Sequence, residues 1–144
     1  MNAYTGRLFE EEVLGEIHVS WNGYMTYRDS VKYVKEHQEW DPTDPDTDKA
    51  NDLHALVAID LDLEDFDELK LYNALNTPMD YFHGVDCFFE FHGEIVTIDL
   101  TINPEKIFYK ADLVVHPDDL EEEGIKNIAY LISHIFQKRD KGGI

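Results

Sequence analysis

Two aspartates, Asp86 and Asp99, are predicted to face each other across one β-hairpin. The segment 84–101 has the alternating pattern of two strands, with the turn at His92-Gly93. Counting back from a two-residue turn sets Asp86 directly opposite Asp99. Directly opposed side chains in an antiparallel pair have Cβ atoms roughly 4.5–5.5 Å apart, and like charges there destabilise the sheet. The commonest chemical reason for such a pair is a shared divalent cation, Mg²⁺ or Mn²⁺.

The two faces of the predicted hairpin differ in polarity. One face is apolar and is expected to form the core; it carries Val85, Cys87, Phe89, Phe91, Val96, Ile98 and Leu100. The other face is expected to be partly covered; it carries Asp86, Phe88, Glu90, Ile95, Thr97 and Asp99. Half-buried carboxylates are costly unless they are paired. Two alternatives to a metal pair stay open: exposed acids at a strand edge whose longer loop shifts the register, and acids held by structural hydrogen bonds.

The other elements follow from apolar periodicity. Helices are expected over residues 8–17, 27–39 and 65–75 and from Pro117 onward, and Thr26 is a suitable N-cap for the second of them. Residues 53–63 fit a strand or a helix capped by Asp52, and residues 111–116 fit a short strand. Prolines and turn formers make 40–46 a loop.

This element order predicts an α+β fold, with a small central mixed sheet built on a β-hairpin meander and flanked by helices. A chain of 144 residues has the length of one domain. We therefore expect a single domain, residues 1–144, with an acidic, loop-rich segment at about 40–52.

Around the hairpin the sequence resembles the PD-(D/E)xK nuclease superfamily. The resemblance rests on Asp86, the short hairpin and the run Ile-Asp-Leu-Thr at 98–101, together with the glutamates that begin at Glu10. It covers about residues 4–13 and 80–115. It implies a restriction-endonuclease-like core that runs helix, three-stranded meander, helix, strand, in which an acid of the first helix often joins the metal site.

The function that this resemblance implies is a metal-dependent nuclease, a phosphodiester hydrolase acting on DNA or RNA. Asp86, Asp99 and Glu10 would bind Mg²⁺ or Mn²⁺, with Glu11 as the other catalytic candidate from the first helix. The metal would polarise the scissile phosphate and lower the pKa of the attacking water.

One position departs from the family pattern. Where the family has lysine, two residues after the second acid, this chain has Thr101, which supplies no cation to stabilise the developing charge. Lys106 or Lys110 is expected to take that role. A basic face for phosphates is expected from the loop before the last strand and the C-terminal helix, formed by Lys106, Lys110, Lys126, Lys138, Arg139 and Lys141.

The charge of the chain favours a different function. The formal net charge is −19, and between Glu36 and Glu68 thirteen acids accompany one base, Lys49. Such a surface repels nucleic acid and attracts cations or basic protein surfaces. The alternative is therefore a non-catalytic acidic interaction protein, such as a nucleic-acid mimic or an inhibitor that binds a basic partner. Thr101 in place of lysine favours this alternative too.

Composition and motif spacing narrow the possible classes of protein and of binding site. With one cysteine, Cys87, and no apolar run near 18 residues, a cytoplasmic protein with no membrane partner is expected. The histidines lack zinc-site spacing, and the glycine loops of nucleotide-binding proteins are missing. The clustered aromatic residues are expected in the core rather than at a base-stacking surface; they are Tyr81, Phe82, Phe88, Phe89 and Phe91.

Overall fold

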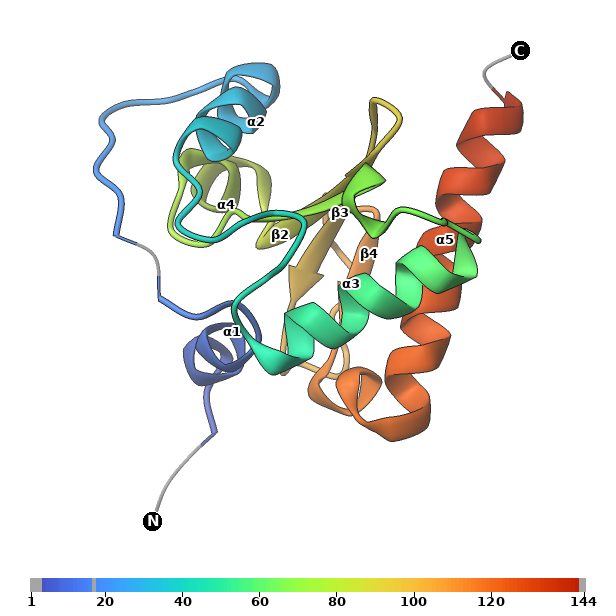
Figure 1. Cartoon of the computed structure of the whole chain (residues 1–144). Helices are drawn as coiled ribbons and strands as arrows, with labels where there is room; N and C mark the ends of the chain where they lie inside the picture. Colours follow the sequence, from blue (N-terminus) through green and yellow to red (C-terminus); the bar gives the residue numbers. More distant parts are fainter. Residues whose placement is uncertain (1–3, 17, 143–144) are drawn as a thin grey trace.

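The computed structural model of this chain describes residues 4–16 and 18–142 (Figure 1). Within these ranges the chain forms five α-helices, two short 3₁₀-helices and one four-stranded sheet. The helices are α1 (Gly6–Leu14), α2 (Tyr27–Glu36), α3 (Asp48–Asp60), α4 (Pro78–His83) and α5 (Glu122–Gly142). The strands are β1 (Leu69–Asn73), β2 (Cys87–Phe91), β3 (Glu94–Leu100) and β4 (Leu113–Val115). The predicted α+β fold class is confirmed.

The sheet has the strand order β1-β2-β3-β4. The first three strands form an antiparallel meander, and β4 pairs in parallel with β3. The hairpin register is as predicted, because Phe91 pairs with Glu94 around a turn in which His92 and Gly93 both have positive φ, 50° and 81°. The same register continued by one residue sets Asp86 opposite Asp99, and the Asp86 N–H donates to the carbonyl of Ile98 at 2.9 Å.

Helices cover both faces of the sheet (Figure 1). α1, α3 and α5 bury apolar side chains in a large core cluster with Phe89 and its neighbours on the sheet. α2 and α4 contribute to a smaller cluster that contains Met79 and Phe88. Because side chains alternate along a strand, Asp86 shares the face of Phe88, and Asp99 across the ladder shares it as well. The paired aspartates therefore lie on the side of the sheet that α2 and α4 cover.

The prediction of a helix over residues 65–75 is wrong. This segment is a 3₁₀ turn, η1 (Phe66–Glu68), followed by strand β1. Phe66, Leu69 and Tyr72 have helical spacing, but Leu69 is buried in the large cluster and Tyr72 in the smaller one. A strand buried on both faces lacks a clean apolar–polar alternation, so its sequence resembles that of a helix.

The ambiguous segment 53–63 is mostly helical. It belongs to α3, whose N-cap is Thr47 rather than Asp52, with Thr47 Oγ1 accepting the N–H of Ala50 at 3.2 Å. The acidic segment 40–52 therefore ends in a helix, because α3 begins at Asp48. Trp40 in its first half is buried and donates through Nε1 to the carbonyl of Leu71 at 2.9 Å.

Several predicted boundaries move. Thr26 caps α2 as expected, but α2 ends at Glu36. α1 ends at Leu14, and Ile17, the predicted end, lies outside the described residues. Residues 81–83 belong to α4 and not to the hairpin. Pro117 opens a 3₁₀-helix, η2 (Pro117–Leu120), and α5 begins at Glu122. Among the helices of the described ranges, none has the length and apolarity to cross a membrane.

Candidate functional site

Four carboxylates from separate parts of the chain lie near one another, and we call them the acid cluster: Glu10, Asp80, Asp86 and Asp99. They come from α1, from α4, from the residue before β2 and from β3. Burial is the largest cause of a raised pKa at Glu10 and at Asp86. The next causes are the charges of the other acids, Asp80 and Asp99 for Glu10, and Asp80 and Glu10 for Asp86. The charges of these acids thus act on one another.

Asp86 is the most enclosed member, with 3% of its surface exposed. Its Oδ2 accepts the backbone N–H of Leu100 at 2.8 Å. Burial, followed by the charges of Asp80 and Glu10, raises the pKa of Asp86 far above its usual range. The pKa of Asp80 is raised as well, chiefly by burial. Both carboxyl groups therefore bind a proton more readily than an exposed aspartate does.

Of the glutamates on α1, Glu10 faces the cluster. It lies one helical turn before the buried residues Val13 and Leu14, so its side chain is half-buried beside them. Burial, then the charges of Asp80 and Asp99, raise the pKa of Glu10 from 4.5 to about 7. Glu11 instead forms an ion pair with Arg7 at 2.9 Å along the helix, with no contact to the cluster among the interactions that the structure describes.

A lysine from the loop after β3 reaches the cluster. Lys106 Nζ lies 2.6 Å from Asp99 Oδ2, and the Asp99 side chain is only 10% exposed. Lys110, the other candidate, donates to the backbone carbonyl of Phe82 at 3.1 Å. Lys106 is therefore the cation that stands beside the second acid, seven residues further along the chain.

Thr101 takes part in the turn that begins this loop. Its N–H donates to the carbonyl of Val115 at 3.0 Å, and its Oγ1 accepts the N–H of Asn103 at 3.1 Å. These bonds direct the loop away from β3, which allows Lys106 to return to Asp99. The role of Thr101 in this structure is thus to shape the lysine-bearing loop.

Sequence reasoning missed Asp80, because no helix was predicted between residue 75 and the hairpin. Asp80 lies in the first turn of α4, and its Oδ2 accepts the N–H of Asn76 at 2.9 Å. A signal was present: Thr77 is a good N-cap residue, Pro78 suits the first helical position, and Asp80 occupies the third, where an acid is favoured.

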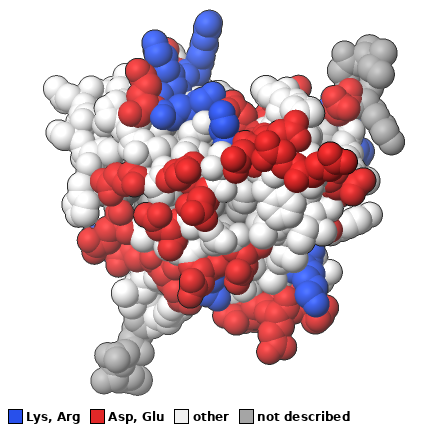
Figure 2. All heavy atoms as spheres, in the orientation of Figure 1, with Lys and Arg blue, Asp and Glu red and all other residues white. Residues whose placement is uncertain are grey.

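Two members of the expected basic face are paired with acids among the described residues. Lys126 pairs with Glu123 at 3.2 Å, and Arg139 pairs with Asp112 at 2.7 Å. The side chain of Lys141 lies outside the described part of the chain. Figure 2 instead shows Lys and Arg gathered over α2, with Asp and Glu spread over most of the visible face.

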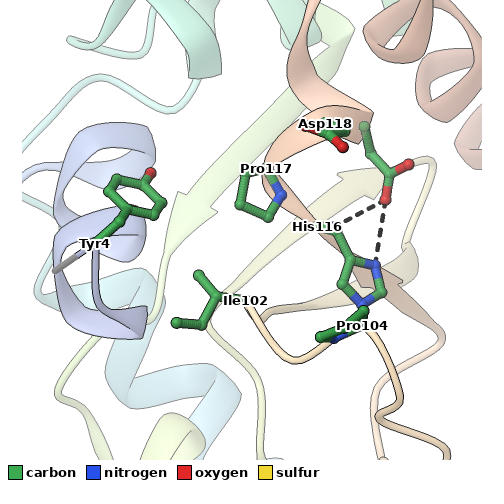
Figure 3. Close-up of a pocket in the computed structure, with 7 residues that line it drawn as sticks. Tyr4, Ile102, Pro104, His116, Pro117 and Asp118 are labelled. Carbon is green, nitrogen blue, oxygen red and sulfur yellow. Dashed lines mark hydrogen bonds and ion pairs between the residues drawn. The ribbon is translucent and has the colours of Figure 1, made fainter.

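A cavity of about 490 Å³ opens beyond the end of β3, where α1, the loop after β3 and η2 meet (Figure 3). Its polar lining is dominated by His116 and Asp119: Asp119 Oδ2 accepts the N–H of His116 at 2.8 Å and lies 3.5 Å from His116 Nδ1. The lining residues are Tyr4, Ile102, Pro104, His116, Pro117, Asp118 and Asp119. None of the acid-cluster residues lines this cavity.

Within the described ranges, no group of three or more His, Cys, Asp or Glu side chains is arranged so that it could hold a metal ion. No protein-family model matches the chain, and no curated protein and no solved structure matches it significantly.

Proposed function

We propose that this chain is a metal-dependent nuclease with a PD-(D/E)xK type of site. The observation that carries the proposal is the ion pair between Lys106 and Asp99 at 2.6 Å, beside a buried carboxylate, Asp86, and a half-buried one, Glu10. An acid–lysine pair next to further acids is the residue set that the D/E-x-K pattern supplies in that superfamily. Here the lysine comes from position 106 in place of Thr101.

The element order supports the same fold type. A helix precedes an antiparallel three-stranded meander, and a fourth strand joins the sheet beside the third. One departure is clear: residues 101–112, all of which the structure describes, connect β3 to β4 without a helix. The Lys106 loop occupies that connection, which accounts for the displaced lysine.

The donor set suits Mg²⁺ or Mn²⁺. Mg²⁺ is usually held by one or two carboxylates, with waters and substrate phosphate oxygens completing its shell, so a cage of three protein ligands is not required. Burial, followed by the charges of neighbouring acids, raises the pKa values of Glu10 and Asp86. Asp86 and Asp99, with Glu10 beside them, would hold the ion. When bound, it would polarise the scissile phosphate and lower the pKa of the attacking water.

The remaining roles belong to the protein's own groups. Lys106 holds a positive charge at Asp99, where it can orient the attacking water and stabilise the charge that develops on the phosphate oxygens. The N–H of Leu100 fixes the carboxyl group of Asp86. The charge of Asp80 adds to burial in raising the pKa of Asp86.

The test is cleavage of plasmid, single-stranded DNA and RNA with Mg²⁺ or Mn²⁺. Asp99→Asn and Lys106→Met should each lower the rate at least about a hundredfold, because each removes a charge at the site of transition-state stabilisation. The exposed pair Glu123 and Lys126 on α5 offers matched controls, Glu123→Gln and Lys126→Met, which should cut like the wild type. Equal cutting by all five proteins would contradict the proposal, as would no cutting by folded wild-type protein.

A second readout does not need substrate. Mg²⁺ binding should release protons from Glu10 and Asp86, because the ligands must be ionised. Calorimetric titration in two buffers of different ionisation enthalpy measures this release, and Asp99→Asn should weaken the binding. Wild-type binding with no proton release would contradict the assignment of these acids.

One observation favours the second candidate, a non-catalytic partner of a basic protein surface. All thirteen acids between Glu36 and Glu68 are exposed, and acids are spread across the face in Figure 2. Binding of a lysine-rich peptide separates the two functions. A charge-driven interaction protein keeps that binding in Asp99→Asn, whereas the nuclease loses its activity in the same variant.

A further inference from the structure

Six aromatic rings form a contiguous surface beside the acid cluster, and we call them the aromatic platform. Trp21 lies 5.6 Å from Tyr81 and 5.5 Å from Phe82, measured between ring centroids, and Tyr24 lies 4.9 Å from Phe82. The members are Trp21, Tyr24, Tyr27, Tyr81, Phe82 and His83. This arrangement corrects the expectation that Tyr81 belongs to the core, since Tyr81 is 75% exposed and Tyr24 is 68% exposed.

The platform is a fixed surface. The segment before α2 is tied to α4 by two hydrogen bonds, from Trp21 Nε1 to the carbonyl of Asn76 at 2.9 Å and between His83 Nε2 and the carbonyl of Met25, also at 2.9 Å. Such anchoring keeps exposed rings in place, and rigid rings lose little entropy when a ligand stacks on them.

Two segments of the chain connect the platform to the acid cluster. Along α4, Asp80 belongs to the acid cluster and the next residue, Tyr81, belongs to the platform. Along the loop after β3, Lys106 contacts Asp99 while Lys110 contacts the carbonyl of Phe82. Phe108, between these two anchors, is 86% exposed. A chain lying over the platform would therefore continue toward Asp99 and Lys106.

The charge near the platform differs from that of the rest of the visible surface. α2 packs against α4 and carries Arg28, Lys32 and Lys35, which all lie at the surface. Lys35 pairs with Glu90 at 2.8 Å, so Arg28 and Lys32 are the cations of α2 that would meet phosphates. Figure 2 shows basic side chains gathered over α2 on a chain whose net charge is −19. Cations next to exposed aromatic rings suit a ligand with a negative backbone and flat bases.

We infer that the aromatic platform binds single-stranded nucleic acid by stacking unpaired bases, and that α2 holds its phosphates. The inference rests on the proposed nuclease function and names its substrate class. Bases within a duplex stack on each other and do not offer their faces to protein rings. A duplex would also bring two charged strands toward an acidic surface, so unpaired strands are favoured over duplex.

The test is binding of a fluorescein-labelled oligothymidine of about 12 nucleotides in EDTA, where cleavage cannot occur. Tyr81→Ala should weaken binding roughly tenfold, the loss of about one stacked base. Tyr130→Ala is the matched control, because Tyr130 is 61% exposed on α5, and it should bind like the wild type. Phe108→Ala tests a second exposed aromatic residue, and this substitution does not disturb the core.

Tryptophan fluorescence gives a direct readout of stacking. Trp21 belongs to the platform, whereas Trp40 is buried and bonded to Leu71, so quenching by the oligonucleotide should come from Trp21. Equal binding by the Tyr81 and Tyr130 variants, or duplex binding as tight as single-strand binding, would overturn the inference. Cleavage that requires Asp99 but not Tyr81 would support the nuclease function and would contradict base stacking on the platform. Oligonucleotide binding that depends on Tyr81, without any cleavage, would support base stacking on the platform and would contradict the nuclease function.

Discussion

At the scale of residues, the acid cluster combines four carboxyl groups with one contacting cation, Lys106. Lys106 serves Asp99, which leaves the other acids to lower their charge by binding protons. The pKa of Asp86 is raised far above its usual range, and the pKa of Glu10 is raised to about 7. A site of this kind changes its charge when a divalent ion or a proton arrives, so its ionisation can be measured by pH.

The pH dependence of stability should reveal Glu10. Its pKa is 4.5 in the unfolded chain and about 7 in the folded protein. Between these values the folded state binds more protons, so the free energy of unfolding falls as pH rises. The full rise corresponds to about 3 kcal/mol, and solvent screening of a half-buried group reduces it to about 1–2 kcal/mol. Glu10→Gln should be more stable than wild type by that amount at about pH 8 and nearly equal at about pH 4.

Urea unfolding of both proteins at the two pH values measures this difference. Glu11→Gln is the control, because Glu11 is on the same helix and pairs with Arg7 instead of facing the cluster. It should not gain stability at high pH. A Glu10→Gln protein that follows the wild-type pH profile would show that Glu10 ionises as a solvated side chain.

At the scale of elements, the sequence predicted the features that depend on residues close together in the chain. The alternation on either side of His92-Gly93 predicted the register, and with it the pairing of Asp86 and Asp99 across the hairpin. Strand β1 and helix α4 were not predicted, because β1 is buried on both faces and α4 has only six residues. Short elements of this kind are stabilised by tertiary contacts that a sequence pattern does not contain.

The residues of the candidate site were likewise predicted only in part. Asp86, Asp99 and Glu10 followed from the motif and its spacing, and Lys106 was one of two lysines that could replace Thr101. Only the fold separates Lys106 from Lys110, because the path of the loop decides which one returns to Asp99. Asp80 depended on α4, and it was missed together with that helix.

The stability of α4 should depend strongly on its cap. Thr77 is fully buried; its Oγ1 accepts the N–H of Met79 at 3.2 Å and donates to the carbonyl of Ala74 at 2.6 Å. Thr77→Ala removes both bonds and should lower the free energy of unfolding by about 1–2 kcal/mol. Thr26→Ala removes an exposed cap on α2 and should cost less, about 0.5–1 kcal/mol. Urea denaturation gives both values, and a larger loss for Thr26→Ala would contradict the buried role of Thr77.

At the scale of the whole molecule, charge is the dominant feature. A net charge of −19 opposes compaction because like charges repel across the surface. The ion pairs along α1 and α5, Arg7 with Glu11 and Lys126 with Glu123, are exposed and each contribute little. Screening by salt should therefore relieve more repulsion than the attraction it removes.

This balance predicts that salt stabilises the protein. Raising NaCl from about 0.05 to about 0.5 M shortens the screening length severalfold and should raise the Tm by several degrees, as measured by circular dichroism. KCl should act equally, since screening does not depend on the identity of the cation. Mg²⁺ at matched ionic strength should add a further rise in wild type that Asp99→Asn lacks, because binding to the folded state adds to screening. A Tm that falls with NaCl would mean that attraction outweighs repulsion on this surface, and an equal Mg²⁺ response in both proteins would place the ion outside the acid cluster.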